Sequence, residues 1–404
     1  MKIVVALDSF KGGLSAEAAC RAVAEGLRAA RPEIAVVCTP MADGGEGTAT
    51  ALLAARPGGA WIAQSASGPL PGQQVQAGYA WFAKDRVAVV EMAAASGLPL
   101  LAEHERNPLK TTTRGTGELI RAAGERGAQR ILLAIGGSAT NDGGIGAAAA
   151  LGWRFLDANG QEVEPVGGRL GAITRIIPPE RAAWPPMTVL CDVTNPLCGP
   201  RGAASVYGPQ KGATPEMVAQ LDDGLRNLAA RIRADLGRDV LELAGGGAAG
   251  GLGAGAVAFF NAELAPGIET IIHESGLRNA LRGADWCITG EGAFDAQSLD
   301  GKVVSGVAAA ARKCGARVVV FAGQVRVAAA TYRRHGIAEA VALQPPGMPL
   351  AEAIQRTAEL LRDAARQWIR AESVNNERTG RTRMKRPIRS NPSTSDVESE
   401  GKPR

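Results

Sequence analysis

The sequence predicts an α/β fold in which a discontinuous Rossmann/flavodoxin-like parallel-sheet domain is interrupted by a second, mixed α/β domain. Short apolar runs alternate with helix-like patterns at both ends of the chain, and a different pattern fills the middle. The length of 404 residues suits two domains, since a domain typically has roughly 100–200 residues. Apolar, β-branched runs that alternate with helices are typical of parallel strands that are buried on both faces.

The first part of the chain predicts a strand, a helix, a second strand and a second helix. Lys2–Leu7 is a short apolar run, after which Ala19, Val23 and Leu27 recur at helical spacing. Ile34–Cys38 is a second apolar run, and a glycine-rich loop leads from it into a helix rich in alanine and leucine. This order predicts the start of a parallel sheet.

The same alternation returns near the other end of the chain. Strands are predicted over Asp285–Thr289, Val318–Phe321 and Ala338–Leu343, and a helix around Val303–Lys313 separates the first two. A last helix, Leu350–Ile369, carries an apolar stripe that would cover the sheet. When the two ends are joined, they supply five strands.

The middle of the chain predicts the inserted domain. Its strand-like segments are Trp61–Ser65, Val75–Ala80, Val87–Glu91, Ile131–Ile135, Trp153–Leu156 and Thr188–Asp192. We therefore predict a Rossmann-like domain over residues 1–60 and 276–372 and an inserted α/β domain over residues 61–275. Residues 373–404 form a basic tail with few large apolar residues, which we expect to be disordered.

Charge and cysteine content exclude some classes of function. The net charge is +5, but the basic residues cluster in the tail without interleaved aromatic residues, so we expect no nucleic-acid partner. No uncharged apolar run reaches the roughly 18 residues that cross a bilayer, so we expect no membrane partner. The six cysteines form no CxxC pair. We therefore expect reduced thiols and a cytoplasmic location, and the oligomeric state stays open.

A glycine loop follows the strand predicted at Ile131–Ile135. It contains Gly136, Gly137 and Ser138 and leads into an alanine-rich helix, an arrangement in which backbone N–H groups can bind a phosphate. The alternative is a tight turn in which glycine only permits a positive φ. Two loose GxGxxA matches carry little weight in a chain with 52 glycines, and no GxxxxGK[ST] P-loop occurs.

Other glycine-rich loops and strand ends carry charged residues that suit phosphoryl transfer. That reaction needs cations near the phosphates, carboxylates that hold Mg²⁺ and a base for the substrate hydroxyl. Arg106 could bind a substrate carboxylate with two hydrogen bonds, or form a surface salt bridge. The alternatives for the others are solvated lysines and turn-forming aspartates. The candidates are Lys11, Lys211, Lys302, Asp43, Glu46, Asp192 and Glu291.

Together these motifs resemble the bacterial type 1 glycerate kinase family over about residues 1–370. The resemblance implies an enzyme that uses ATP and Mg²⁺ to phosphorylate D-glycerate to 2-phospho-D-glycerate in organic-acid and glyoxylate catabolism, with its active site between two domains. The segments that carry it include DSFKGGLSA (8–16), ADGGEGT (42–48), RNPLKTTTRGTGELI (106–120), IGGSATNDGG (135–144), CDVTNPLCGPRGAASVYGPQKGATPE (191–216), GGGAAGGLGAG (245–255) and ITGEG (288–292).

Under this resemblance each candidate residue receives an expected role. Asp192 would act as the base, with Lys11 and Lys211 beside the transferring phosphoryl group. The expected ligands are Arg106, Ser9 and Asn195 for the substrate, Gly136, Gly137, Ser138 and Lys302 for the nucleotide, and Asp43, Glu46 and Glu291 for Mg²⁺.

The sequence departs from the family pattern directly after Glu291-Gly292. Ala293 stands where the family commonly has arginine, and if that arginine contacts phosphate, Arg282 or Arg326 could replace it. Three other functions stay open. These are a glycerate kinase that forms 3-phosphoglycerate, an NAD(P)-dependent hydroxy-acid oxidoreductase and a non-catalytic metabolite sensor.

Overall fold

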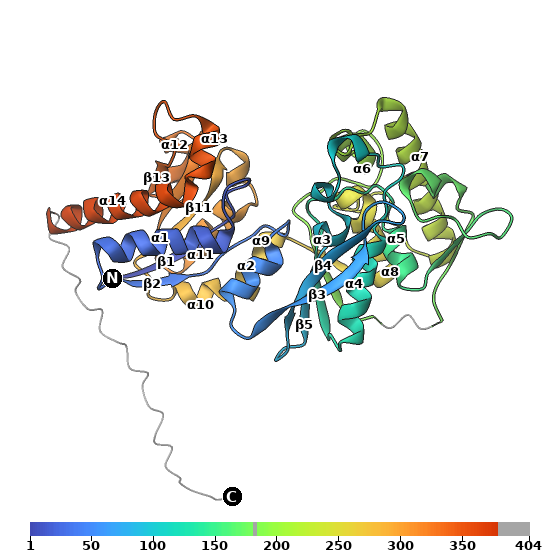
Figure 1. Ribbon diagram of the computed structural model, residues 1–404, viewed down its shortest axis with the longest axis horizontal. Coiled ribbons are helices and arrows are strands. Elements are labelled where there is room, and N and C mark those ends of the chain that lie inside the picture. The colour runs from blue at the N-terminus through green and yellow to red at the C-terminus, as the bar shows by residue number, and fades with distance from the viewer. Residues whose placement is uncertain (181–183, 379–404) are drawn as a thin grey trace, which may run out of the picture.

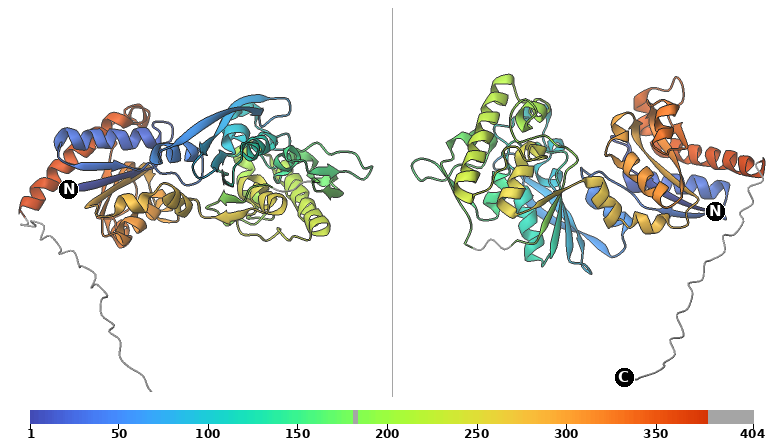
Figure 2. Two further views of the ribbon diagram at one scale, coloured as in Figure 1. Left: turned by 90° about the horizontal axis from the view of Figure 1, so that it is seen from below. Right: turned by 180° about the vertical axis from the view of Figure 1, so that it is seen from behind.

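The computed structural model describes residues 1–180 and 184–378, which form two bodies side by side (Figure 1). Two further views show the same arrangement (Figure 2). Each body is built on its own β-sheet, and the two ends of the described chain lie in the same body. Within the described residues, no helix combines the length and the hydropathy that a bilayer-crossing segment requires.

The first sheet takes its strands from both ends of the chain, and all its neighbouring strands are parallel. Its spatial order is β13–β12–β11–β1–β2, which corresponds to the order 2-1-3-4-5 of flavodoxin-like sheets. This confirms the predicted fold class. The strands are β1 (Lys2–Leu7), β2 (Ala35–Cys38), β11 (Trp286–Phe294), β12 (Arg317–Val325) and β13 (Glu339–Ala342).

Helices cover both faces of this sheet, because successive side chains of a strand point to opposite faces. Val5 of β1 packs in one apolar cluster with Leu27 and Leu361 of two helices. Its neighbour Val4 packs in another cluster with Ile271 and Val307. The first face is covered by α1 (Ala16–Ala30) and α14 (Thr357–Arg378), and the second by α9 (Gly267–Glu274), α10 (Leu277–Leu281), α11 (Val303–Lys313) and α12 (Ala329–Arg334).

The predicted single helix over Leu350–Ile369 is wrong in one respect, because the structure has two helices there. These are α13 (Leu350–Gln355) and α14, separated at Arg356, whose φ and ψ are −96° and 11°. The Thr357 hydroxyl lies at the break and is within hydrogen-bonding distance of the carbonyl oxygens of residues 353 and 354. Helix α14 continues to residue 378, past the predicted end of the fold at 372, and the rest of the predicted basic tail lies outside the described residues.

The second sheet is mixed, as predicted for the inserted part, and has the order β10–β9–β6–β5–β4–β3. Strands β3, β4 and β5 pair antiparallel, whereas β5, β6, β9 and β10 pair parallel. Its strands are β3 (Gly59–Ser67), β4 (Gln74–Phe82), β5 (Val87–Glu91), β6 (Arg130–Ala134), β9 (Met187–Leu190) and β10 (Glu263–Ala265). A separate two-stranded sheet pairs β7 (Arg154–Leu156) with β8 (Arg175–Ile177). The helices of this body are α3 (Ala93–Ser96), α4 (Arg114–Glu125), α5 (Ile145–Ala150), α6 (Ala203–Tyr207), α7 (Pro215–Leu236) and α8 (Leu252–Phe260).

The two sheets share one apolar core. Helix α2 (Thr48–Ala55) and α9 contribute to a buried cluster that includes Val4 of the first sheet and Leu132 of the second. Beside it, the nearly buried carboxylate of Glu274 accepts hydrogen bonds from Arg56 and Arg130. This core fixes how the strand ends of one sheet approach those of the other. The domain boundaries predicted near residues 60 and 276 stay predictions.

Candidate active site

Two pockets open at the carboxyl ends of the strands, and Asp43 and Lys302 line both of them. Their volumes are about 360 and 340 Å³, which suits small-molecule ligands, and open α/β sheets bind ligands at this edge. The sheet pocket includes Asp8, Lys11, Glu291, Gln324 and Ile354. The glycine-loop pocket includes Gly45, Gly136, Gly137, Ser138 and Asp192.

Asp43 and Lys302 form an ion pair where the pockets meet. Lys302 Nζ lies 3.3 Å from Asp43 Oδ2. Asp43 follows β2 and Lys302 directly precedes α11, so the pair joins two loops of the first sheet. Burial alone would lower the pKa of Lys302, but the carboxylates of Asp43, Asp192 and Glu291 together raise it. Lys302 is therefore a cation at neutral pH, and ligands in either pocket can reach it.

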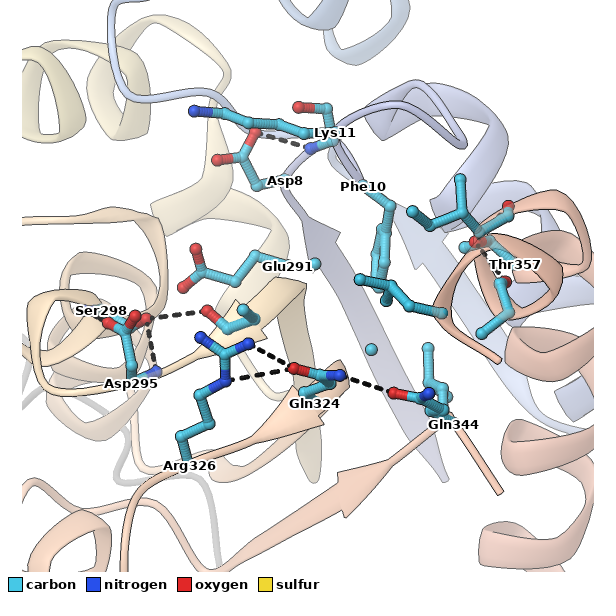
Figure 3. A pocket seen from close by; sticks show the side chains of 18 of the residues that line it. Asp8, Phe10, Lys11, Glu291, Asp295, Ser298, Gln324, Arg326, Gln344 and Thr357 are labelled. Carbon is cyan, nitrogen blue, oxygen red and sulfur yellow. Dashed lines mark hydrogen bonds between the residues drawn. The ribbon is translucent and has the colours of Figure 1, made fainter. Parts of the chain in front are cut away.

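Two further carboxylates, Asp8 and Glu291, project into the sheet pocket (Figure 3). Asp8 directly follows β1 and Glu291 lies in the second half of β11, and these are the neighbouring strands at which the strand order reverses. Burial, reinforced by the negative charge of Asp43, raises the pKa of Asp8 to about 7. Burial also raises the pKa of Glu291, whose Oε1 is buried and has no hydrogen-bond partner among the described residues. A bound cation would stabilise the ionised form of these carboxylates.

A chain of hydrogen bonds lies along another wall of the sheet pocket (Figure 3). Arg326 Nε donates to Gln324 Oε1 (3.1 Å), and Gln324 Nε2 donates to Gln344 Oε1 (2.7 Å). Gln344 Nε2 in turn donates to the carbonyl oxygen of Met348 (2.7 Å). The chain fixes the orientation of both amide groups.

Arg282 and Arg326 are the two arginines that could replace the arginine absent at position 293, and they lie in different parts of the structure. Arg326 lines the sheet pocket, and in the described ranges its guanidinium forms hydrogen bonds to Gln324 and no ion pair. The carbonyl of Arg282 accepts a hydrogen bond from the side chain of Lys2, at the amino end of β1. Arg282 therefore lies at the opposite edge of the sheet, and Arg326 is the one near the pocket.

The glycine-loop pocket is formed largely by backbone. A Cβ at position 136 would lie 2.6 Å from the Cα of Gly45, so only glycine lets the loop after β6 contact the loop after β2. Gly137 has a φ of +75°, which also favours glycine. These two residues place Ser138 in the pocket wall.

Lys211 lies behind this loop instead of in the pocket, where we expected it to face a phosphoryl group. Its side chain is 1% exposed, and its Nζ donates to Ser138 Oγ (2.8 Å) and to the carbonyl oxygen of Thr140 (2.6 Å). Burial lowers the pKa of Lys211 to about 7, although the negative charge of Asp142 acts in the opposite direction. Asp142 is fully buried and accepts two hydrogen bonds from Thr113. These buried side chains thus support the loop from behind through their hydrogen bonds.

Asp192 follows β9 and lines the glycine-loop pocket. Its Oδ1 accepts a hydrogen bond from the backbone N–H of Gly267, the first residue of α9, at 2.7 Å. Burial, together with the negative charge of Asp43, raises the pKa of Asp192 to about 6, although the hydrogen bond from Gly267 opposes this. Asp192 is therefore mostly ionised at neutral pH but easily protonated, which suits a general base.

The structure brings most of the sequence-predicted residues to the two pockets and leaves four outside. Glu46 is exposed on the loop before α2. Asn195 lies behind Tyr207, whose hydroxyl donates to Asn195 Oδ1 (2.8 Å) and which lines the pocket itself. The third is Arg106, whose buried Nε has no hydrogen-bond partner in the part of the chain that the structure describes, and the fourth is Lys211. The residues that line a pocket are Ser9, Lys11, Asp43, Gly136, Gly137, Ser138, Asp192, Glu291 and Lys302.

Several residues of the sheet pocket were not predicted from the sequence. Asp8 could have been predicted as a site residue, because it is a carboxylate directly after a buried strand. No sequence pattern marks Gln324 or Gln344 as a site residue, since a single glutamine at a strand end is common in any α/β protein. Leu350 and Ile354 were assigned to a covering helix, where their spacing predicts only packing.

Comparison with known proteins places these observations in a family. The model of the Glycerate kinase family matches residues 3–372. The chain is 44% identical over 368 residues to "Glycerate kinase" of Halalkalibacterium halodurans, covering 90% of this chain and 96% of that one. It is 44% identical over 346 residues to "Glycerate 2-kinase" of Escherichia coli, covering 83% and 89%.

A solved structure agrees with this result. The crystal structure of a provisionally assigned glycerate kinase 2 from Salmonella typhimurium superposes with a TM-score of 0.83 at 42% identity, covering 93% of this chain and 99% of that one. The predicted family resemblance is thereby confirmed. The chain belongs to the glycerate kinase family.

Proposed function

We propose that this chain transfers the terminal phosphoryl group of ATP to the 2-hydroxyl of D-glycerate, forming 2-phospho-D-glycerate in organic-acid or glyoxylate catabolism. Family membership supports the kinase activity, and the Escherichia coli relative named glycerate 2-kinase supports the product. The observation that carries the proposal is the Asp43–Lys302 pair, which stands between two ligand-sized pockets. Two reactants can thus reach one cation from opposite sides. The six free cysteines support a cytoplasmic location.

In the proposed mechanism, Asp192 accepts the proton of the glycerate hydroxyl while the oxygen attacks the terminal phosphorus of ATP. The bond between that phosphorus and the bridging oxygen breaks, and ADP leaves. Its pKa of about 6 leaves it ionised at neutral pH. Lys302 lies near Asp192, and its positive charge stabilises the negative charge on the transferring group. The backbone N–H groups of Gly136 and Gly137 would bind the oxygens of that group.

The carboxylates of the sheet pocket suit Mg²⁺, which would neutralise charge on the ATP phosphates. Carboxylate oxygens are its preferred protein ligands, and the partnerless Oε1 of Glu291 is an available one. Within residues 1–180 and 184–378 no three Asp, Glu, His or Cys side chains are close enough to hold a metal ion by themselves. This suits Mg²⁺, which is often held by one or two carboxylates plus substrate phosphates. We propose that Glu291 takes this role together with either Asp43 or Asp8, and that the exposed Glu46 does not.

The remaining predicted residues receive supporting roles. Ser9 and Lys11 line the sheet pocket beside Asp8 and would contact reactant oxygens. Lys211 would position Ser138 through its hydrogen bond. Arg106 would need to reorient its buried, partnerless Nε to bind the glycerate carboxylate.

The test is an assay of ATP, Mg²⁺ and D-glycerate with the product identified by coupling enzymes. Product that enolase consumes directly is 2-phosphoglycerate, as proposed. Product that enolase consumes only after phosphoglycerate mutase is added would establish the 3-phosphoglycerate alternative. No formation of ADP would refute the kinase function and favour a metabolite sensor.

A further inference from the structure

We propose that the sheet pocket is the nucleotide site and that it binds the adenosine end of ATP against a wall formed by the end of β13, α13 and α14. The inference rests on the proposed kinase function and assigns one reactant to each pocket. The triphosphate would extend from this wall past Glu291 to Lys302, and glycerate would occupy the glycine-loop pocket with Asp192.

The wall is apolar and accessible from the pocket. Leu343, Ile354 and Leu360 line it together with Phe10, and Leu350 at the start of α13 is 53% exposed. In Figure 3, Phe10 and Thr357 lie on one side of the pocket, and Asp8 and Glu291 lie on the other. A ligand that is apolar and flat at one end and strongly anionic at the other fits this division. Glycerate has three carbons and would leave the wall uncovered.

The amide chain next to the wall provides polar groups for a base. Gln344 uses one N–H for the carbonyl of Met348 and one lone pair for Gln324, so within residues 1–180 and 184–378 one donor and one acceptor of its amide are left. The amide donor matches the acceptor N7 of adenine, and the amide acceptor matches the N6 amino group. Guanine instead offers two acceptors, N7 and O6, at these positions. We therefore expect a preference for ATP over GTP.

The position of the proposed base supports the same assignment. Asp192 lines the glycine-loop pocket and not the sheet pocket, whereas Lys302 lines both. With glycerate beside Asp192 and the nucleoside at the apolar wall, the terminal phosphate arrives at Lys302, between the two reactants. The opposite arrangement would place the glycerate hydroxyl in the sheet pocket, which Asp192 does not line.

A charge placed on the wall tests the assignment. We expect Leu350→Asp to raise the Kd for the non-hydrolysable analogue AMP-PNP at least about tenfold, because a carboxylate replaces an apolar contact. Ala351→Asp is the matched control, since it adds the same charge one residue further on the same helix at an exposed position that does not line the pocket. It should change the Kd less than about twofold. Calorimetric titration measures both values without turnover.

Three further measurements complete the test. The KM of Leu350→Asp for D-glycerate should stay within about twofold of wild type, and wild type should bind AMP-PNP more tightly than GMP-PNP. Photo-crosslinking with 8-azido-ATP should label a peptide within residues 343–360. A raised KM for glycerate with unchanged AMP-PNP affinity, an equal loss in both variants, or a label on residues 190–210 would overturn the assignment. Wild-type AMP-PNP binding without glycerate phosphorylation would refute the proposed function and leave the nucleotide site standing.

Discussion

The two pockets share an ion pair and have similar volumes, but they are built from different materials. The sheet pocket is formed by side chains from strand ends and helices at both ends of the chain. The glycine-loop pocket is formed by backbone turns with buried charges behind them. A pocket of side chains can exchange one residue for another, and Ala293 and Arg326 both line this pocket. A pocket of backbone cannot, because Gly136 has no room for a Cβ.

This contrast predicts how the pockets respond to substitution. In the sheet pocket, single side chains should control nucleotide affinity one contact at a time. In the glycine-loop pocket, the reactive group Asp192 and the support from Lys211 should control rate and stability.

The largest effect is expected for Asp192→Asn. If Asp192 is the base, kcat should fall by about 10²–10⁴, the usual contribution of general-base catalysis, while the Kd for AMP-PNP stays unchanged. Asparagine keeps the Oδ1 that accepts the hydrogen bond from Gly267, so the fold should persist. The exposed Asp239→Asn serves as the control. A loss below about fivefold would remove Asp192 from the chemical step.

Lys302→Met should lower kcat by about 10²–10³, because it removes a cation from the point where both reactants meet. Lys11→Met is the matched comparison, since Lys11 lines the sheet pocket and not the other one. We expect Lys11→Met mainly to raise the KM for ATP. Steady-state kinetics separates the two effects, and equal losses of kcat would contradict the shared role of Lys302.

The sequence predicted the regular strands well and their site-bearing ends poorly. β5 was predicted as Val87–Glu91 and has these bounds, because its apolar run is bounded by polar residues. β11 continues five residues past the predicted end at Thr289, although the extension contains two glycines. That extension pairs with β12, so tertiary contacts and not local preference decide it, and it carries Glu291. The break between α13 and α14 at Arg356 could not be predicted, because no glycine or proline stands there.

The parts of the site that are glycine loops could be predicted from the sequence. The parts that form when distant segments of the chain come together could not. The loop at Gly136 was recognisable from its composition, but nothing in the sequence shows that Lys211 approaches it from behind. The apolar wall of the sheet pocket forms because Phe10 after β1, Leu343 after β13 and Ile354 of α13 line the same pocket, which brings together opposite ends of the chain. The assigned roles of the site residues stay predictions.

The pH dependence should distinguish the carboxylates of the two pockets. Because the pKa of Asp192 is about 6 and a base must be deprotonated, kcat/KM for glycerate should fall about tenfold per pH unit below about pH 6. Asp8 lines the sheet pocket and Asp192 lines the other one, so residual activity of Asp8→Asn should show the same midpoint. A midpoint that moves with this variant would assign the transition to the sheet pocket, where the pKa of Asp8 is about 7.

A smaller effect is expected for Arg326→Gln, because this arginine is exposed and solvent screens its charge. The KM for ATP should rise about fivefold and the KM for glycerate should stay constant. Arg282→Gln, at the opposite edge of the sheet, should change neither value. Adding Ala293→Arg to Arg326→Gln should restore the KM, because position 293 pairs with Gln324 on the neighbouring strand. Failure of this rescue would show that Arg326 does not stand in for the missing arginine.

The smallest effect on catalysis, but a distinctive one on stability, is expected for Lys211→Met. Burial lowers the pKa of Lys211 from 10.5 to about 7, so between these values the unfolded chain binds a proton that the folded chain does not. The contribution of Lys211 to the free energy of unfolding is therefore least favourable below pH 7 and rises towards pH 10.5, by an amount on the order of a few kcal/mol.

Methionine fills a similar volume and does not titrate, so the Tm of wild type minus that of Lys211→Met should increase as the pH is raised from 6.5 to 9.5. The exposed Lys313→Met should show no such trend. A constant difference would mean that Lys211 is charged in the folded protein throughout this range. The loop would then be held by a permanent buried cation, and the backbone pocket would depend on charge as directly as the sheet pocket does.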